Sequence, residues 1–359
     1  MRHLPLAASE WKSEEVSLRP PPGLRARAGP LQDADGRAIR YVRVSVTDRC
    51  DLRCTYCMPE GGEKEHGSRP EILTFEETAR LVRVLAQGGV VRARFTGGEP
   101  LLRKDIVELV ALVHRFAPDV ALCLTTNATR LDRYAADLFR AGLRKLNVSL
   151  DTIDPDRFRE VTRGGDVARV VRGIEAARRA GFDGVSLNAV ALRGINDDEF
   201  GTLVDWAWEH GITPRFIELM PIGEGARLPA SMQIGWREIA ARLGDRIALD
   251  GAVRPQDRGP AFYLPAADGS DCRVGFITAV TESFCDTCNR IRVSARGDLR
   301  ACLASRRSVS LRDAMRIGLG DDEILGQVAW ALGMKDESHH FDSAKTTEHQ
   351  RVCMSLIGG

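Results

Sequence analysis

The sequence predicts an α/β fold in which parallel strands alternate with helices and bend into a partial (β/α)6 barrel of the TIM type. Short apolar runs rich in β-branched residues alternate with amphipathic stretches of helical period from about residue 40 to residue 220. Each intervening helix returns the chain in the same direction, so consecutive strands are parallel. The alternation stops after Gly223, where a smaller C-terminal α+β unit is expected.

Six strands and five helices are expected in order along this region. The strands are predicted at Tyr41–Val46, Val90–Phe95, Val120–Leu124, Lys145–Leu150, Val185–Val190 and Arg215–Leu219. The helices between them are predicted at Phe75–Gln87, Lys104–Phe116, Leu131–Ala141, Val167–Ala180 and Asp197–Glu209.

Four segments follow from this pattern. Residues 1–36 mix Pro, Ala, Arg and Glu without periodicity, which predicts a flexible N-terminal extension. The partial barrel covers 37–223, a C-terminal domain covers 224–345, and a tail over 346–359 ends in two glycines.

The composition excludes several classes of function. Basic and acidic residues number 51 and 50, so no global field favours nucleic acid or an anionic membrane. No apolar run reaches the length of a membrane span, and the N-terminus lacks the pattern of a secretion signal. Cysteines grouped at short spacing favour reduced thiols on a metal, and hence a cytoplasmic protein, over a disulfide framework.

Six of the nine cysteines fall into two triplets. Cys50, Cys54 and Cys57 have the spacing C-x3-C-x2-C, with Tyr56 before the last cysteine. A zinc site is the alternative for this triplet, and His66 is then the nearest fourth ligand. Three thiolates are one fewer than a closed tetrahedral site requires, so the spacing favours a cluster with an open coordination position.

The second triplet, Cys285, Cys288 and Cys302, has the spacing C-x2-C-x13-C. Taken alone, it could also form a zinc ribbon whose fourth ligand is missing or is a histidine. The remaining cysteines, Cys123, Cys272 and Cys353, have no partner spacing and are interpreted as structural thiols.

Unusual residues follow the predicted strands. Cys50–Cys57 follow the first strand, Thr96–Pro100 the second, Thr125–Asn127 the third, Asp151 the fourth and Met220 the sixth. The loops at the carboxyl ends of parallel strands build the active sites of such barrels. The sequence therefore predicts a single site at one end of the sheet.

The first triplet, with its aromatic residue, resembles the signature of the radical S-adenosylmethionine (SAM) superfamily, and Thr96–Pro100 resembles the glycine turn of that superfamily. The resemblance implies a [4Fe-4S] cluster whose fourth iron binds SAM, and reductive cleavage of SAM to a 5'-deoxyadenosyl radical.

From about Tyr41 to Gly359 the chain resembles one family more closely, the GTP 3',8-cyclases, or molybdenum cofactor biosynthesis protein A. The resemblance is carried by the segments Arg43–Cys50, Arg94–Pro100, Asn147–Asp151, Arg215–Met220, Phe284–Arg292 and Met354–Gly359. It implies a second [4Fe-4S] cluster on the later triplet, whose open iron binds the guanine of GTP.

The resemblance also implies residue roles. The SAM contacts fall on Tyr56, Gly98, Ser149 and Met220. The GTP contacts fall on Arg43, Arg94, Thr125, Ser186, Arg215, Arg290, Ile291 and Arg292. One guanidinium group can donate two parallel hydrogen bonds to phosphate oxygens, which suits the binding of a triphosphate. Arg290, Arg292, Gly358 and Gly359 are the residues expected to be needed for catalysis.

Two positions depart from the family pattern. Ser186 occupies the place of a phosphate-binding lysine, and only six lysines occur in the chain. Either GTP binds more weakly, or a nearby cation such as Arg193 or Arg163 compensates for the missing charge, or the substrate differs. Ala128 stands where glycine usually follows Thr-Thr-Asn, which costs little unless the backbone there needs a positive φ.

The implied reaction converts GTP to 3',8-cyclo-7,8-dihydro-GTP, the first step of molybdenum cofactor biosynthesis. The implied partners are a reductant protein and the next pathway enzyme, which receives the product; a homodimer is compatible with the sequence. Two alternatives stay open at this point, a radical SAM enzyme acting on another substrate such as a peptide, and a non-enzymatic metal-binding regulator.

Overall fold

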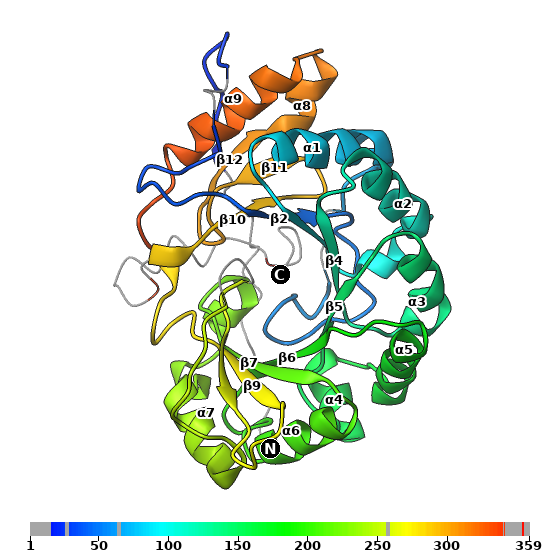
Figure 1. The fold of residues 1–359 in the computed structure, drawn as a ribbon, viewed down its shortest axis with the longest axis vertical. Helices are drawn as coiled ribbons and strands as arrows, with labels where there is room; N and C mark the ends of the chain where they lie inside the picture. The colour runs from blue at the N-terminus through cyan, green and yellow to red at the C-terminus, as the bar shows by residue number, and fades with distance from the viewer. Residues whose placement is uncertain are drawn as a thin grey trace.

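The computed structural model describes residues 16–25, 29–62, 66–255, 259–339, 341 and 354. Its described strands form one sheet in the order β1-β12-β11-β10-β2-β3-β4-β5-β6-β7-β9-β8. Figure 1 shows that the strands follow an open arc and that α1 to α6 cover its outer side.

The central strands are parallel and lie in sequence order, as the alternation predicts. They are β2 (Tyr41–Ser45), β3 (Arg92–Thr96), β4 (Ala121–Thr126), β5 (Lys145–Ser149), β6 (Val185–Ala191) and β7 (Thr213–Glu218). The predicted strands are confirmed with shifts of one or two residues at their ends. The arc is open, since its two outermost described strands, β1 and β8, do not pair with each other.

The helices of this region are α1 (Phe75–Gln87), α2 (Ile106–Phe116), α3 (Leu131–Arg140), α4 (Pro155–Thr162), α5 (Val167–Arg179) and α6 (Phe200–Glu209). Helix α4 was not predicted. Its local signals are nonetheless clear, because Asp154 accepts hydrogen bonds from the amides of Asp156 and Arg157, and Pro155 occupies the first turn.

The two faces of the arc differ in chemistry. Residues of the helix-facing side, such as Val42, Val44, Phe95 and Leu146, are buried in the main hydrophobic core. Because side chains alternate along a strand, the intervening residues face the concave side. Many of these are polar, and on β2 and β3 they include Arg43 and Arg94. The alternation therefore lines the inside of the arc with groups suited to a charged ligand.

The C-terminal unit extends the arc at both ends. Its strands are β8 (Phe262–Pro265), β9 (Arg273–Ile277), β10 (Arg290–Val293), β11 (Asp298–Arg300) and β12 (Arg307–Ser310), and its helices are α7 (Trp236–Leu243), α8 (Leu311–Arg316) and α9 (Asp321–Leu332). Strand β9 pairs with β7, while β10 pairs with β2, both in parallel. The unit thereby brings the second cysteine triplet to the concave side.

The segment predicted to be a flexible extension is partly attached to this sheet. Strand β1 (Val16–Ser17) pairs in parallel with β12, and the amide of Leu18 donates to the carbonyl of Ser308 at 2.7 Å. Asp33 is buried. The composition of residues 1–36 does not predict these contacts, because they depend on partners about three hundred residues away in the chain.

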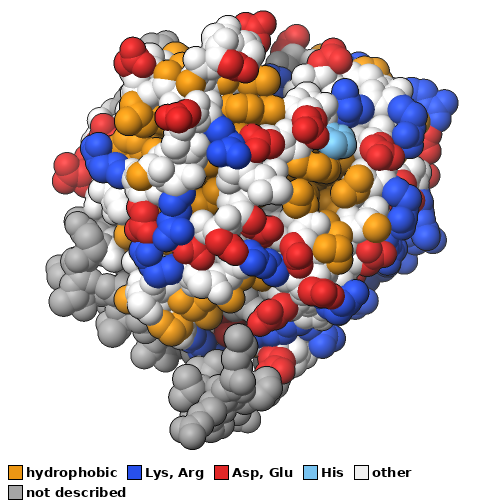
Figure 2. All heavy atoms as spheres, turned by 90° about the horizontal axis from the view of Figure 1, so that it is seen from below, with side chains coloured by type: hydrophobic (Ala, Val, Ile, Leu, Met, Phe, Trp, Pro, Cys, Tyr) orange, Lys and Arg blue, Asp and Glu red, His pale blue; other side chains and the backbone are white. Residues whose placement is uncertain are grey.

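Two further observations agree with the composition. Figure 2 shows a face on which acidic and basic side chains are interspersed. In the part of the chain that the structure describes, no helix is long and apolar enough to cross a bilayer.

Candidate active site

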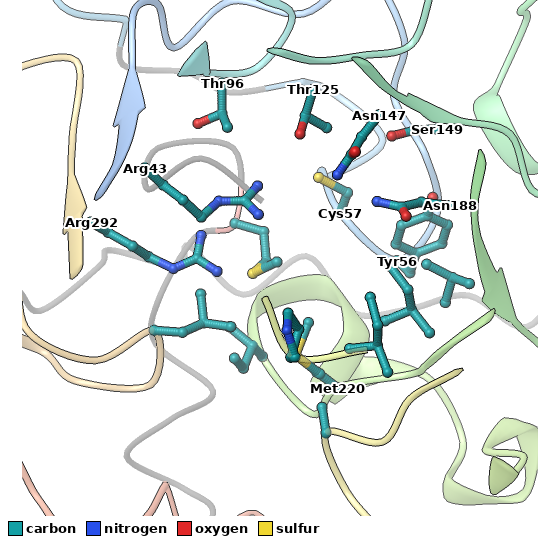
Figure 3. A pocket seen from close by; sticks show the side chains of 18 of the residues that line it. Arg43, Tyr56, Cys57, Thr96, Thr125, Asn147, Ser149, Asn188, Met220 and Arg292 are labelled. Atoms are coloured by element: carbon teal, nitrogen blue, oxygen red, sulfur yellow. The ribbon is translucent and has the colours of Figure 1, made fainter. Parts of the chain in front are cut away.

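A single cavity on the concave side gathers both cysteine triplets. The lining includes most of the residues predicted to bind clusters, SAM or GTP: Cys50, Cys54, Cys57, Cys285, Cys288, Cys302, Tyr56, Gly98, Ser149, Met220, Arg43, Arg94, Thr125, Arg215, Arg290 and Arg292. Figure 3 shows Arg43 and Arg292 entering from one side, with Ser149 and Asn188 on the other. Residues from both ends of the chain therefore share one chamber.

The first triplet lies on the loop that follows β2. The amides of Cys57 and Met58 both donate to the carbonyl of Cys54, at 2.9 and 3.0 Å, which makes the loop a compact turn. Burial raises the pKa of the Cys50 thiol to about 12 and also raises that of Cys54. Metal binding must therefore displace protons from these thiols.

The ligand arrangement bears on the zinc alternative. Among the described residues, no three His, Cys, Asp or Glu side chains surround a single metal-ion position. His66, the candidate fourth ligand, lies beside Asp48 and is absent from the cavity lining. Thiolates on one zinc ion would each lie about 2.3 Å from it. Three thiols on one short loop, with no fourth protein ligand beside them among the described residues, fit a four-iron cluster better, because each thiolate there binds a different iron.

The glycine turn packs directly against this loop. The amide of Gly98 donates to the carbonyl of Thr47 at 2.9 Å, and that of Glu99 donates to the carbonyl of Arg49 at 2.7 Å. A Cβ atom at Gly98 would lie 2.4 Å from the Arg49 carbonyl oxygen. Only glycine permits this approach, so the turn and the cysteine loop have a fixed relation.

Tyr56 is held by a carboxylate from another strand. Its hydroxyl donates to Asp151 at 2.7 Å, and Asp151 also accepts from the amide of Val190 at 2.8 Å. Burial raises the pKa of Asp151 to about 6, against the opposing effect of these hydrogen bonds. The predicted SAM contact on the cysteine loop is thereby tied to β5 and β6.

A group of arginines forms the most strongly charged part of the cavity: Arg43, Arg94, Arg215, Arg290 and Arg292. Strand register explains the group, since Arg292 pairs with Arg43 and Arg43 pairs with Arg94 on three adjacent parallel strands. Burial, with a smaller contribution from the neighbouring arginines, lowers the pKa of Arg43 to about 10. Burial and like charges also lower the pKa of Arg292 and Arg215.

The geometry of these arginines calls for an anionic ligand. Nε and Nη2 of Arg215 are buried, and no hydrogen-bond partner for either atom occurs in the described part of the chain. Two further atoms of cavity-lining residues, Oγ1 of Thr96 and Oδ1 of Asn188, are also buried and have no hydrogen-bond partner in the described part of the chain. Buried donors are normally satisfied. A polyanion would satisfy the donors and offset the mutual repulsion of the arginines.

The second triplet faces the same space from the C-terminal unit. Cys285 and Cys288 bracket a short turn, and Arg290 Nη2 lies 3.9 Å from the sulfur of Cys288. Burial opposes ionisation of Cys288, but Arg290 and Lys335 outweigh it and lower the pKa of that thiol. The Arg290 guanidinium also lies 4.8 Å from the ring centre of Phe284. Both cysteine loops thus contribute to the lining of one cavity.

Two predicted GTP contacts do not line the cavity. Ser186 faces the concave side of β6 two residues before Asn188, which does line it. Ile291 alternates with Arg290 and Arg292 on β10 and packs in the main core, so its side chain points away. Any contact of Ile291 with GTP would therefore come from its backbone. Gly358 and Gly359 lie outside the described residues.

The proposed compensation for Ser186 is wrong for both named arginines. Arg193 forms a two-point ion pair with Glu238 at 2.6 and 2.8 Å, and Arg163 donates to the carbonyl of Met58 at 2.8 Å. Neither lines the cavity. The charge of the missing lysine is not replaced by either of them.

The cost assigned to Ala128 also needs correction. Its φ is 59°, in the left-handed region, and its side chain is fully buried. An L-residue with a Cβ atom is strained in this conformation by about 1–2 kcal/mol. The substitution of glycine by alanine here is therefore not neutral.

Several lining residues were not singled out from the sequence as functional. Asn147 and Asn188 occupy concave positions of β5 and β6, while Glu99 and Glu218 follow β3 and end β7. Glu99 accepts from the Thr126 hydroxyl and from the amide of Asn127, both at 2.7 Å. For Glu99 and Glu218 the available signal was their place at strand ends, and for Asn147 and Asn188 it was a polar residue alternating with apolar ones along a strand.

The fold and the two cysteine loops define a class. The chain matches the family model described as Radical SAM superfamily over residues 44–207, and the model described as Molybdenum Cofactor Synthesis C over residues 212–341. It is therefore a radical SAM enzyme with a second, C-terminal unit.

Close relatives identify the family within this class. The GTP 3',8-cyclases of Heliobacterium modesticaldum and Caulobacter vibrioides are 44% and 42% identical to this chain, covering 91% and 97% of it and 99% and 98% of their own lengths. That of Hydrogenovibrio crunogenus is 38% identical over 91% of the chain and 99% of its own length. The chain belongs to the GTP 3',8-cyclase family.

A solved structure supports the fold alone. The crystal structure of Streptococcus suis SuiB bound to the precursor peptide SuiA has a TM-score of 0.58 at 15% identity, and the match covers 82% of this chain and 66% of that chain. It shows a shared architecture and carries no information on substrate.

Proposed function

We propose that this protein is a GTP 3',8-cyclase that converts GTP to 3',8-cyclo-7,8-dihydro-GTP. The observation that carries the proposal is the shared cavity, whose lining combines the two cysteine triplets with five arginines, three of which lie on adjacent paired strands. The family relatives supply the reaction, and the anion-binding chemistry of the cavity supports a nucleoside triphosphate as the substrate.

The residues divide into three groups by role. Cys50, Cys54 and Cys57 would hold the first [4Fe-4S] cluster, with Tyr56, Gly98, Ser149 and Met220 around SAM; Cys285, Cys288 and Cys302 would hold the second cluster. When bound, the first cluster and SAM supply radical hydrogen abstraction. The arginines bind and orient the triphosphate, while the walls exclude water.

The arginines and the glycine turn favour a GTP 3',8-cyclase over the two alternative functions. A radical SAM enzyme for peptides needs no set of five arginines in its cavity, and a metal-binding regulator needs no glycine turn against the first cysteine loop. We further propose that a cytoplasmic reductant protein donates electrons, that the next pathway enzyme receives the product, and that Gly358 and Gly359 take part in turnover.

The test is reconstitution under anaerobic conditions. Two four-iron clusters predict about eight irons per chain, and GTP consumption that requires both SAM and a reductant. Protein with about four irons, or with SAM cleavage that never consumes GTP, would contradict the proposal. Cys285→Ala is expected to lower the iron content and abolish GTP conversion while leaving SAM cleavage measurable.

A further inference from the structure

A buried ionic network lies behind the second cysteine loop, outside the cavity lining. Lys335 Nζ lies 2.9 Å from Asp33 Oδ2, and the two side chains are 2% and 0% exposed. Arg37 Nε lies 2.7 Å from the same carboxylate oxygen, and its side chain is 9% exposed. The network joins the segment before β2 to the segment after α9.

Both cations of the network also donate hydrogen bonds to the backbone of the cluster cysteines. Arg37 Nη1 donates to the carbonyl of Cys285 at 2.7 Å, and Lys335 Nζ donates to the carbonyl of Cys288 at 3.0 Å. Arg37 Nη1 also donates to the carbonyl of Glu337 at 2.8 Å. The two cysteines of the C-x2-C turn are therefore each held by a different charged side chain.

The acidic member is preorganised by its own turn. Asp33 Oδ1 accepts from the amides of Asp35 and Arg37 at 3.2 and 2.9 Å, and Gly36 adopts a φ of 77°. The amide of Asp33 in turn donates to the carbonyl of Arg37 at 3.2 Å. Although burial opposes ionisation, the hydrogen bonds from Lys335 and Arg37 lower the pKa of Asp33, which keeps it anionic. The network thus holds two cations and one fully buried carboxylate, and Arg37 Nη2 also pairs with the more exposed Asp35 at 2.7 Å.

Stability alone is a poor reason for such an arrangement. Replacing a buried ion pair by apolar residues of similar volume is often neutral or stabilising, whereas removing one partner costs about 3–5 kcal/mol. The distinctive feature here is where the donors point, since both cations reach carbonyls of cluster-ligating residues. These hydrogen bonds favour a role for the network in positioning the cluster ligands.

We propose that Asp33, Arg37 and Lys335 are positioning residues for the second cluster: they fix the Cys285–Cys288 turn and direct two cationic groups at its carbonyls. The inference rests on the proposed function, because it takes the second triplet to hold the cluster that receives GTP. A cluster on three thiolates gains negative charge on reduction, and nearby cations favour the reduced form. The network would then set both the orientation of the open iron and its reduction potential.

The experiment isolates the second cluster and removes the charge of Lys335, first alone and then together with that of Asp33. In a background of Cys50→Ala, Cys54→Ala and Cys57→Ala, the reconstituted full-length chain is compared with its Lys335→Met variant and its Asp33→Asn/Lys335→Met variant. Arg246→Gln serves as the control, because Arg246 forms a two-point pair with Asp205 and neither residue lines the cavity. The readouts are iron content, the midpoint potential of the cluster, its spectral response to GTP and the thermal midpoint.

The expected results separate positioning from stability. Lys335→Met should make the midpoint potential more negative and weaken the spectral response to GTP at least several-fold. The double variant, which also removes the buried carboxylate that lost one of its two cationic partners, should recover part of the thermal stability without recovering the GTP response. Arg246→Gln should leave the potential and the GTP response unchanged.

Two failures are distinguishable. If the background protein holds no second cluster or shows no spectral response to GTP, the proposed function fails. If the background behaves as proposed but both Lys335 variants keep its potential and its GTP response while only stability changes, the network is structural and the inference is overturned. Lys335→Arg, which keeps the charge, should restore most of the GTP response; a failure to do so would also count against it.

Discussion

At the scale of single residues, the site is defined by groups that are costly in the unliganded protein. Arg43 and Arg292 lie on paired strands, and burial lowers the pKa of both. Burying like charges destabilises the folded protein, and binding of an oppositely charged ligand offsets that destabilisation. Buried like charges therefore point to a functional site. Ala128 is costly for a different reason, because its left-handed backbone conformation favours glycine.

Ala128→Gly is expected to stabilise the protein by up to about 1 kcal/mol, because the relief of left-handed strain outweighs the extra freedom that glycine gives the unfolded chain. The measurement is the thermal midpoint of the cluster-loaded protein. Ala135→Gly, at a buried position inside α3, is the control and should destabilise by about 1 kcal/mol. Destabilisation by both substitutions would contradict the argument.

Ser186→Lys is expected to tighten GTP binding about tenfold, since it restores a cation on the concave side of β6 and a charged hydrogen bond contributes about 1.5–3 kcal/mol. Equilibrium binding to the loaded protein without reductant gives the answer. Ser186→Met, similar in length but uncharged, should not tighten binding. An unchanged affinity in the lysine variant would mean that another group already neutralises that phosphate.

Glu99 provides a pH prediction. Burial raises its pKa from an ordinary value of 4.5 to about 7. Between these values the folded protein keeps the proton that the unfolded chain releases, so stability should fall as pH rises from about 5 to 8. Thermal midpoints across this range, without SAM, should show a shallower fall in Glu99→Gln than in the parent chain. Parallel curves would contradict the assignment.

At the scale of elements, the loops of the site are held by residues at strand ends. Glu218, at the end of β7, accepts from the amides of Val280 and Thr281, both at 2.8 Å, and from that of Trp236 at 3.0 Å. The Thr281 hydroxyl donates to the same carboxylate. This one side chain joins the central arc to the loop that leads to Cys285.

Glu218→Ala should leave three backbone donors without their partner, at about 1–3 kcal/mol for each one that stays buried. The expected result is preferential loss of the second cluster, seen as a fall from about eight irons to about four, while SAM cleavage persists. Glu209→Ala, at an exposed position at the end of α6, should keep the full iron content. Equal loss from both clusters would point to general destabilisation instead.

At the scale of the whole molecule, the C-terminal unit completes the chamber. Strands β9 and β10 continue the sheet beyond β7 and β2, so the two triplets meet although they are more than two hundred residues apart. The chamber therefore depends on both ends of the arc. The mutual repulsion of its arginines should fall only when an anion binds among them.

GTP is accordingly expected to raise the thermal midpoint of the loaded protein. At a concentration one hundred times its dissociation constant, binding contributes about 2.7 kcal/mol. Guanosine, which lacks the phosphates, should give a much smaller rise at the same concentration. If both ligands gave the same rise, the arginines would not be the triphosphate site.

Most of the central arc was predictable because its determinants are local. The alternation of apolar strands with amphipathic helices identified β2 to β7 and five of the helices, and short spacing identified both cysteine triplets. Helix α4 was missed although its Asp154 and Pro155 are ordinary start signals. The domain boundaries and the individual residue roles stay predictions.

What the sequence alone determined is the chemistry: the cysteine loops, the glycine turn and the family that combines them. Only the tertiary structure decided which residues share a chamber, because strand pairing brings Arg292 beside Arg43, whereas Arg163 and Arg193 lie outside the strands and do not line the cavity. It also decided the fate of Asp33, which composition assigns to a flexible extension. Its partner Lys335 lies three hundred and two residues further along the chain, and no local pattern records so distant a contact.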